Sequence, residues 1–121
     1  MAQVLVVDDD ADVAELVRTV LTISGHTVAA ATDGLRGLAA ASEAHPDLVV
    51  LDWMMPGMTG IEVCRTLRLD SAFDGTRIMM LTAKSTPADL DAARDAGADD
   101  YVTKPFVPRE LRQRVADLLG S

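Results

Sequence analysis

Five short apolar runs alternate with five helical patterns along the 121 residues, and this alternation limits the possible folds more than any other feature. Three of the runs, VLVV, LVVL and IMML, are apolar at every position, which is typical of central strands in a parallel sheet that is covered on both faces. Repeated strand–helix units imply parallel strands joined by right-handed crossovers. The sequence therefore predicts an α/β fold, a (βα)5 doubly wound five-stranded parallel sheet, in one domain over residues 1–121. The expected strands are Gln3–Val7, Thr27–Ala31, Asp47–Leu51, Arg77–Leu81 and Asp100–Val102.

The segments between these strands carry apolar residues three and four positions apart, as amphipathic helices do. Gly25 stands where the first helix is expected to end, and Pro87 and Pro108 suit the first turns of the fourth and fifth helices. We expect one stripe of each helix to face the sheet. The five stripes are Val13, Leu16, Val17 and Val20; Leu35, Leu38, Ala39 and Ser42; Ile61, Cys64 and Leu67; Leu90, Ala93 and Gly97; and Leu111, Val115 and Leu118.

The charge balance and the cysteine count exclude several classes of protein. A net charge of −8 argues against a nucleic-acid-binding surface, which needs a basic patch, and suits the binding of a cation. A single cysteine, Cys64, cannot form an internal disulfide, and this predicts a reducing compartment. No apolar run approaches the ~20 residues of a membrane span, and no signal peptide is evident. We therefore expect a soluble, cytoplasmic protein with no direct contact to nucleic acid or membrane.

Polar side chains follow four of the five strands, at the point where each strand ends. Ligands of parallel sheets bind beyond the carboxyl ends of the strands, where the strand order reverses. Carboxylates without neighbouring His or Cys suit a hard cation such as Mg²⁺ rather than zinc. A lysine and a hydroxyl suit a phosphoryl group, so together these side chains predict phosphoryl transfer to an aspartate. They are Asp8, Asp9 and Asp10 after the first strand, Asp52 after the third, Thr82 after the fourth and Lys104 after the fifth.

Each of these residues also has a purely structural interpretation. Asp10 stands next to a helix start and is expected to be its N-cap. Asp8 and Asp9 would likewise favour a helix N-terminus, but the polar groups at the other strand ends favour metal binding. Asp52 and Thr82 would otherwise belong to turns. Lys104 would otherwise be a solvated lysine; facing three carboxylates, it is expected to pair with them.

The motifs VVDDD, LVVLDWMMPGMTG, LTA and GADDYVTKPF, in this order, resemble the receiver domain of two-component response regulators, the CheY-like family. The resemblance covers the whole chain. It implies the flavodoxin-like strand order 2-1-3-4-5 and a cis peptide bond between Lys104 and Pro105. It also implies a signalling domain rather than an enzyme, with self-catalysed phosphorylation and dephosphorylation only.

The resemblance further implies a role for each matching residue. Asp52 would accept a phosphoryl group from a phosphohistidine on a sensor histidine kinase or a phosphotransfer protein. Asp8, Asp9, Asp52 and the backbone carbonyl of Met54 would bind Mg²⁺.

Two further residues would contact the phosphoryl group, and one aromatic residue would respond to it. Thr82 and Lys104 would bind the phosphoryl oxygens. Thr82 and Tyr101 would form a switch, in which Tyr101 turns inward when Thr82 moves.

The switch would change the surface formed by the fourth helix, the fifth strand and the fifth helix. This surface would bind an output domain, a partner protein or, after phosphorylation, a second copy of the chain. Asp99 and Asp100, with Arg112 or Arg114, are candidates for pairs between two copies. Ala92 stands where dimerising relatives often carry a basic residue, which puts that route in doubt. The chain ends at Ser121, and the sequence leaves open a natural single-domain regulator or a receiver excised from a longer protein.

Residues beside the site are expected to tune it or to have no chemical role. Met54 and Lys84 stand two positions after Asp52 and Thr82, and Met54 is predicted to shield the phosphoryl group from water. Trp53 is expected near the mouth of the site, partly exposed. Cys64 is expected to pack on the third helix, and His26 and His45 to be solvated loop residues.

Three rival functions fit the sequence less well. A haloacid-dehalogenase-like phosphatase needs a second acid two residues after the nucleophile, where this chain has Met54. Nucleotide binding is disfavoured because the sequence contains neither the dinucleotide-binding motif G-x-G-x-x-G nor the P-loop motif G-x-x-x-x-G-K-[ST]. An interaction module with an inactive site is disfavoured by the complete set Asp8, Asp9, Asp52, Thr82 and Lys104.

Overall fold

The computed structural model describes residues 2–120 and contains one five-stranded parallel sheet in the order β2-β1-β3-β4-β5. Both the α/β class and the strand order are as expected. Three strand boundaries differ from the prediction by one residue. Strand β3 begins after Asp47, whose carboxylate accepts a hydrogen bond from the Gln3 N–H. Strands β4 and β5 each extend by one residue because Thr82 pairs with Thr103. The strands are β1 (Gln3–Val7), β2 (Thr27–Ala31), β3 (Leu48–Leu51), β4 (Arg77–Thr82) and β5 (Asp100–Thr103).

In the described part of the chain, four of the five helices begin after residues whose side chains satisfy free backbone N–H groups, whereas α5 follows Val107 and has no side-chain cap. The Asp10 carboxylate accepts hydrogen bonds from the first turn of α1, as expected for an N-cap. Thr59 and Thr86 form reciprocal capping boxes at α3 and α4, and Pro87 and Pro108 occupy the first turns of α4 and α5 as predicted. The helices are α1 (Ala11–Ile23), α2 (Gly34–Ala44), α3 (Gly60–Arg68), α4 (Pro87–Ala96) and α5 (Pro108–Leu119), with a short 3₁₀ turn η1 (Ser71–Phe73).

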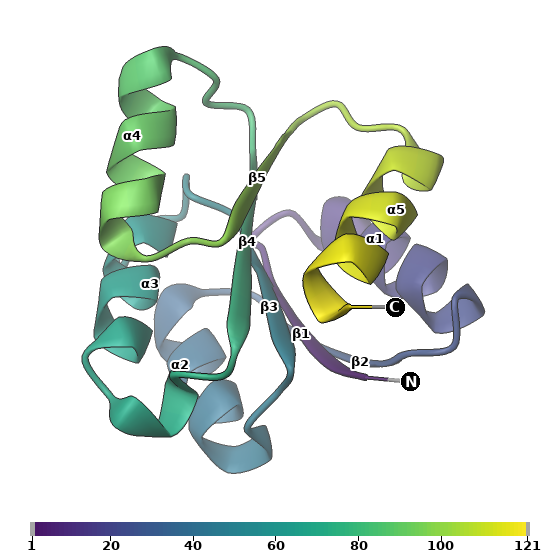
Figure 1. The fold of residues 1–121 in the computed structure, drawn as a ribbon, viewed down its shortest axis with the longest axis horizontal. Coiled ribbons are helices and arrows are strands. Elements are labelled where there is room, and N and C mark those ends of the chain that lie inside the picture. The colour runs from purple at the N-terminus through teal and green to yellow at the C-terminus, as the bar shows by residue number, and fades with distance from the viewer. Residues whose placement is uncertain (1, 121) are drawn as a thin grey trace.

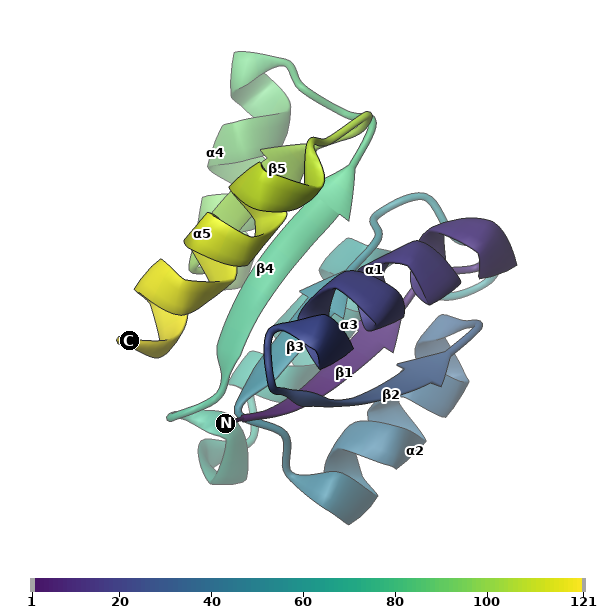
Figure 2. The ribbon, with the colours of Figure 1, turned by 90° about the vertical axis from the view of Figure 1, so that its right-hand side faces the viewer.

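The helices cover both faces of the sheet (Figure 1). Helices α1 and α5 pack on one face, where Val17 and Leu111 are fully buried; they lie in front of the sheet in Figure 2. Helices α2, α3 and α4 pack on the other face around residues such as Ile61 and Ala93. The apolar runs of β1, β3 and β4 are therefore buried from both sides, as their composition predicted.

Helix α2 uses only part of the predicted stripe: Leu38 packs against the core, whereas Leu35, Ala39 and Ser42 are exposed. Leu35 is 71% exposed, and the buried positions are Gly34, Gly37 and Ala41. The cause is the close approach of α2 to the sheet: a Cβ at Gly37 would lie 2.9 Å from a methyl carbon of Val7. Small residues therefore form the buried face of α2. The prediction relied on large apolar residues and placed this face about one position away.

Two further stripe residues, Leu16 of α1 and Leu90 of α4, are also exposed, although both were expected to face the sheet. The buried face of α4 consists of Ala93 and Ala96. Within residues 2–120, none of the helices combines the length and the hydropathy that crossing a membrane requires.

Candidate functional site

The ends of β1 and β3 bring three carboxylates together. The two strands are neighbours in register, with Val7 beside Leu51, and the Asp52 N–H donates a hydrogen bond to the Val7 carbonyl. Asp8 and Asp52, one residue further along, are therefore adjacent and buried, while Asp9 lies at the surface. One carboxylate oxygen from each of Asp8, Asp9 and Asp52 lies within 4.8 Å of the others.

Lys104 supplies the positive charge at this cluster. Its Nζ lies 2.9 Å from Asp8 Oδ2 and 3.6 Å from Asp52 Oδ2, and all three side chains are largely buried. The parallel pairing of β4 with β5 places Lys104 there, and its N–H donates to the Thr82 carbonyl. The Lys104–Pro105 peptide bond is cis, as expected.

Asp8 is buried because both of its oxygens have partners. The Asp10 N–H donates to Asp8 Oδ1 over 2.9 Å, and Lys104 pairs with Oδ2. A buried carboxylate is tolerated when its charge is paired and hydrogen-bonded. Asp10 itself caps α1, so it contributes to the site by orienting Asp8 through its backbone.

Asp52 is in a less favourable environment for a charged carboxylate. Burial and the nearby Asp8 raise the pKa of Asp52, while Lys104 and the Met54 N–H oppose this rise. The net direction is upward, so the folded protein holds this carboxylate at some cost in stability. A cation placed among the three carboxylates would relieve that cost.

The loop between β3 and α3 holds Asp52 in place through its backbone. The Trp53 carbonyl accepts hydrogen bonds from the N–H groups of Met55 and Gly60. A Cβ at Gly60 would lie 2.0 Å from the Asp52 carbonyl oxygen, so only glycine fits at the start of α3. Trp53 is half-buried, as expected, and the Met54 side chain is 59% exposed beside the site.

Thr82 is fully buried at the end of β4 and is connected to the loop that follows it. The Lys84 N–H lies 3.4 Å from Thr82 Oγ1, and the Tyr101 hydroxyl donates to the Lys84 carbonyl over 2.6 Å. Burial, and then the charge of Asp89, raise the pKa of Tyr101 to about 12. The contact between Tyr101 and Lys84 was missed by sequence reasoning, because the two residues are 17 positions apart and no sequence motif links them.

The donor set fits magnesium. Carboxylate oxygens are the ligands that hard divalent cations prefer, and Mg²⁺ keeps several waters beside them. Asp8, Asp9 and Asp52 meet this requirement at the carboxyl edge of the sheet, next to the reversal of strand order between β1 and β3.

Three sequence predictions outside the cluster need correction. Asp99 and Asp100 were candidates for pairs between two copies, but both have partners within the chain: Arg68 lies 2.8 Å from Asp99, and Arg114 forms an ion pair with Asp100. His26 is half-buried rather than solvated, because its Nδ1 accepts a hydrogen bond from the Ala2 N–H.

Two other predictions hold in part or in full. His45 is exposed in a loop, as expected, but its ring also stacks on Phe73 with 5.2 Å between centroids. Cys64 lies on the buried face of α3 and is fully buried, as predicted.

Comparison with known proteins agrees with this geometry. Residues 4–116 match the model of the response regulator receiver domain. The chain is 51% identical over 113 residues, 93% of its length, to the DNA-binding response regulator MtrA of Mycolicibacterium paratuberculosis, and 46% identical over 97% of its length to the response regulator MprA of Mycobacterium ulcerans. It covers 49% and 50% of these two proteins, and so spans about half the length of the curated relatives it matches.

Solved structures give the same result. The chemotaxis protein CheY4 of Vibrio cholerae superposes with a TM-score of 0.93 at 35% identity, and the match covers 98% of each chain. The BeF3-activated DrrB receiver domain superposes with a TM-score of 0.89 at 34% identity, covering 100% of this chain and 99% of that one. With its strand order and its acidic sheet edge, this chain belongs to the response regulator receiver domain family of two-component systems.

Proposed function

We propose that this chain is a phosphoacceptor signalling domain, in which Asp52 accepts a phosphoryl group from a phosphohistidine of a sensor histidine kinase or a phosphotransfer protein. One observation carries the proposal: a buried carboxylate of raised pKa stands between two further carboxylates and a single buried ammonium. The side chains of Asp8, Asp9 and Asp52, with the Met54 carbonyl, would hold Mg²⁺.

The reaction is a displacement at phosphorus. An Asp52 carboxylate oxygen attacks the phosphorus atom, and the bond from phosphorus to the imidazole nitrogen breaks; the nitrogen keeps the electron pair and takes up a proton. Magnesium, when bound, offsets negative charge on the phosphoryl oxygens. The Lys104 ammonium would do the same, and the Thr82 hydroxyl would donate a hydrogen bond. Hydrolysis of the acyl phosphate returns the carboxylate, so the domain modifies only itself and turns over no external substrate.

The signal would be read at the surface of α4, β5 and α5. The phosphoryl group on Asp52 carries roughly −1.5 to −2 in charge, by analogy with other phosphorylated side chains, and it replaces the single negative charge of the free carboxylate. Thr82 turns toward the new oxygens, Tyr101 follows, and the population shifts to a second conformation. An output domain or partner protein would bind that face, and we place the domain in the cytoplasm with its kinase.

A phosphorylation-dependent homodimer remains part of this proposal, but the ion pairs first expected between two copies would have to replace pairs within each chain. Arg114 and Asp100 already pair within one chain, so they would have to exchange partners to join two copies. We also propose that the chain itself does not bind nucleic acid, because the acidic net charge of −8 opposes a phosphate backbone.

The direct test is to incubate the protein with Mg²⁺ and acetyl phosphate and to measure its mass. We expect the gain of one phosphoryl group in the wild type, none in Asp52→Ala, and none when EDTA replaces Mg²⁺. Size-exclusion chromatography of the same samples reports any change in oligomeric state. A wild-type mass that stays constant with both reagents present would refute the proposal.

Met54 supplies a second prediction about the same site. Its side chain is exposed and it follows Asp52 by two positions, so we expect it to hinder the approach of water to the phosphoryl group. The Met54→Asn variant should lose phosphoryl groups several times faster than the wild type, because a polar amide can orient the attacking water. Following dephosphorylation by mass after removal of the donor checks this; an equal or slower rate in the variant contradicts shielding.

A further inference from the structure

The first residue of α2, Gly34, lies directly against the loop between β3 and α3. A Cβ at Gly34 would be 2.9 Å from both the carbonyl oxygen and the Cβ of Met58, and 3.0 Å from a methyl carbon of Val63 on α3. Ordinary van der Waals contacts of a Cβ atom are 3.4–4 Å long, so these atoms would overlap. The missing side chain of Gly34 therefore determines how close the loop can lie to α2.

The same loop carries the backbone groups of Met54 that act at the site. The Met54 N–H interacts with the Asp52 carboxylate and opposes the rise in its pKa, and the Met54 carbonyl is a proposed ligand of Mg²⁺. Between Met54 and Met58, the Met55 side chain is buried in the core, and Pro56 has a fixed φ. This short stretch is therefore stiff, and a displacement of Met58 would be passed on to Met54.

Helix α2 has less freedom to move than the loop. It lies directly on the sheet, because a Cβ at Gly37 would be 2.9 Å from the methyl carbons of Val7, and Ala41 is fully buried. The loop, by contrast, is exposed at Pro56 and Gly57, and a cleft of about 340 Å³ lies between this part of the loop and the first turn of α2. A side chain at the start of α2 should therefore displace the loop rather than the helix.

We propose that Gly34 is a positioning residue for the metal site: by leaving room for Met58, it lets the loop between β3 and α3 present the Met54 carbonyl to Mg²⁺. This inference rests on the proposed function, because Met54 is a metal ligand only in that proposal. The three carboxylates follow β1 and β3 and do not depend on this contact. A larger residue at Gly34 should therefore weaken the binding of Mg²⁺ without abolishing it.

The Gly34→Ala variant tests this both without and with the metal. In EDTA, the backbone amide NMR signals of Met54 and Met58 should differ from those of the wild type, because the loop moves before any metal binds. In a titration with Mg²⁺ followed at the Asp9 amide, the half-saturating concentration should rise by about tenfold, at the low end of the loss caused by disturbing the support of a metal ligand. A variant that binds Mg²⁺ as tightly as the wild type overturns the proposal.

Two control variants separate this effect from a general loss of stability. Ala41→Gly loosens the same helix at a buried position two turns further along, and it should bind Mg²⁺ like the wild type. Gly75→Ala adds the same methyl group where it meets open space, and it should also have the wild-type affinity. If Ala41→Gly weakens Mg²⁺ binding as much as Gly34→Ala does, the effect comes from the stability of α2, and the proposal is wrong.

A milder pair of variants applies if Gly34→Ala does not fold. The Asp33 carboxylate accepts a hydrogen bond from the Arg36 N–H and caps α2. Asp33→Ala removes this cap and loosens the first turn of α2 beside the loop, whereas Asp33→Asn removes the same charge but keeps a good cap. Asp33→Ala should therefore bind Mg²⁺ more weakly than Asp33→Asn. Equal affinities of these two variants would refute the proposal.

The same titration separates this inference from the proposed function. If the amide signals of Asp9 and Asp52 in the wild type show no saturable response to Mg²⁺, the proposed metal site is wrong, and the role of Gly34 is wrong with it. If the wild type binds Mg²⁺ and Gly34→Ala binds it equally well, the proposed function stands and this inference alone fails.

Discussion

Tyr101 illustrates how a single residue can depend on neighbours that are distant in the sequence. Its hydroxyl donates to the Lys84 carbonyl, and its pKa is raised to about 12 by burial and by the charge of Asp89. Both effects disfavour the phenolate. The phenol therefore stays neutral well above physiological pH, and its hydroxyl remains available to donate to the loop between β4 and α4.

The raised pKa predicts how stability depends on pH in the alkaline range. The folded state keeps its phenolic proton up to about pH 12, whereas the unfolded chain releases it near pH 10, so the free energy of unfolding should fall as pH rises between these values. Because Tyr101 is the only tyrosine, phenolate absorbance reports it alone, and Tyr101→Phe gives the baseline. A titration midpoint near 10 in the folded protein would contradict the prediction.

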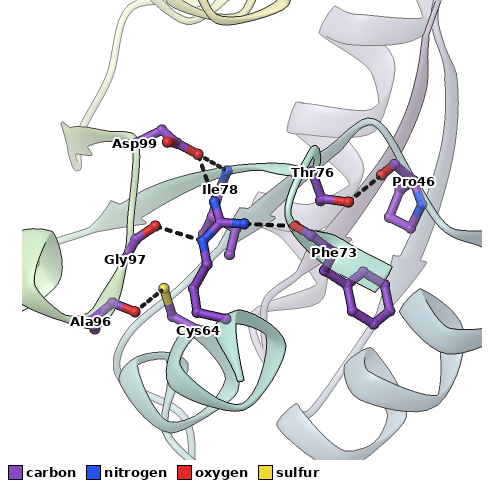
Figure 3. Close-up of polar contacts among 9 residues, drawn as sticks. Pro46, Cys64, Phe73, Thr76, Ile78, Ala96, Gly97 and Asp99 are labelled. Carbon is purple, nitrogen blue, oxygen red and sulfur yellow. Dashed lines mark hydrogen bonds and ion pairs between the residues drawn. The ribbon is translucent and has the colours of Figure 1, made fainter. Parts of the chain in front are cut away.

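At the scale of elements, Arg68 joins α3 to the segments around it. Nη1 donates to the Phe73 carbonyl, Nε to the Gly97 carbonyl and Nη2 to the Asp99 carboxylate, which also accepts the Ile78 N–H (Figure 3). Gly97 ends α4 with a φ of 105°, and a Cβ there would lie 2.4 Å from Arg68 Cγ. Arg68 therefore fixes the position of the turn between α4 and β5.

Removing this side chain should destabilise the domain. Arg68→Ala removes three charge-assisted hydrogen bonds, although the Ile78 N–H still donates to Asp99 and the Thr76 N–H to the Phe73 carbonyl. Hydrogen bonds that involve a charged group contribute roughly 1.5–3 kcal/mol. We expect a loss of about 2 kcal/mol in urea unfolding. Arg65→Ala, an exposed site on the same helix, should change stability by less than about 0.5 kcal/mol. Equal losses in the two variants would show that the contacts of Arg68 do not matter.

For the molecule as a whole, the carboxyl edge of the sheet concentrates negative charge in a chain whose net charge is already −8. The raised pKa of Asp52 means that its ionised form is less favourable in the folded than in the unfolded chain. The resulting loss of stability appears as pH rises above the pKa of Asp52 in the unfolded chain, and it is complete above the pKa of Asp52 in the folded protein. At neutral pH, without a divalent cation, the site therefore costs stability.

Asp52→Asn should remove this cost. In EDTA at neutral pH, we expect the melting temperature of the variant to rise by about a few degrees, and Mg²⁺ to stabilise the wild type more than the variant. Asp95→Asn, which removes an exposed charge from α4, is the matched control for net charge. If Asp52→Asn melts at or below the wild-type temperature in EDTA, repulsion among the carboxylates of Asp8, Asp9 and Asp52 does not measurably lower the stability of the folded protein.

Most of the fold could be predicted because it depends on patterns that are local in the sequence. The apolar runs gave the strands, and the residues that cap or open helices, such as Asp10 and Pro87, gave the helix starts. The order of the strands came from the family resemblance rather than from the runs. The buried face of α2 was misplaced because close packing on Val7 selects glycine and alanine, which carry no hydrophobic signal of their own.

The sequence by itself determined which polar residues end the strands, and the rule that parallel strands share one carboxyl edge was enough to predict that Asp8, Asp52 and Lys104 meet. Only the tertiary structure decided their electrostatics, because burial and distance set the pKa of Asp52 and the partners of Asp8. It also decided that Lys84 lies over Trp53. Contacts of this kind depend on how two loops pack in space, and no periodicity along the chain encodes them.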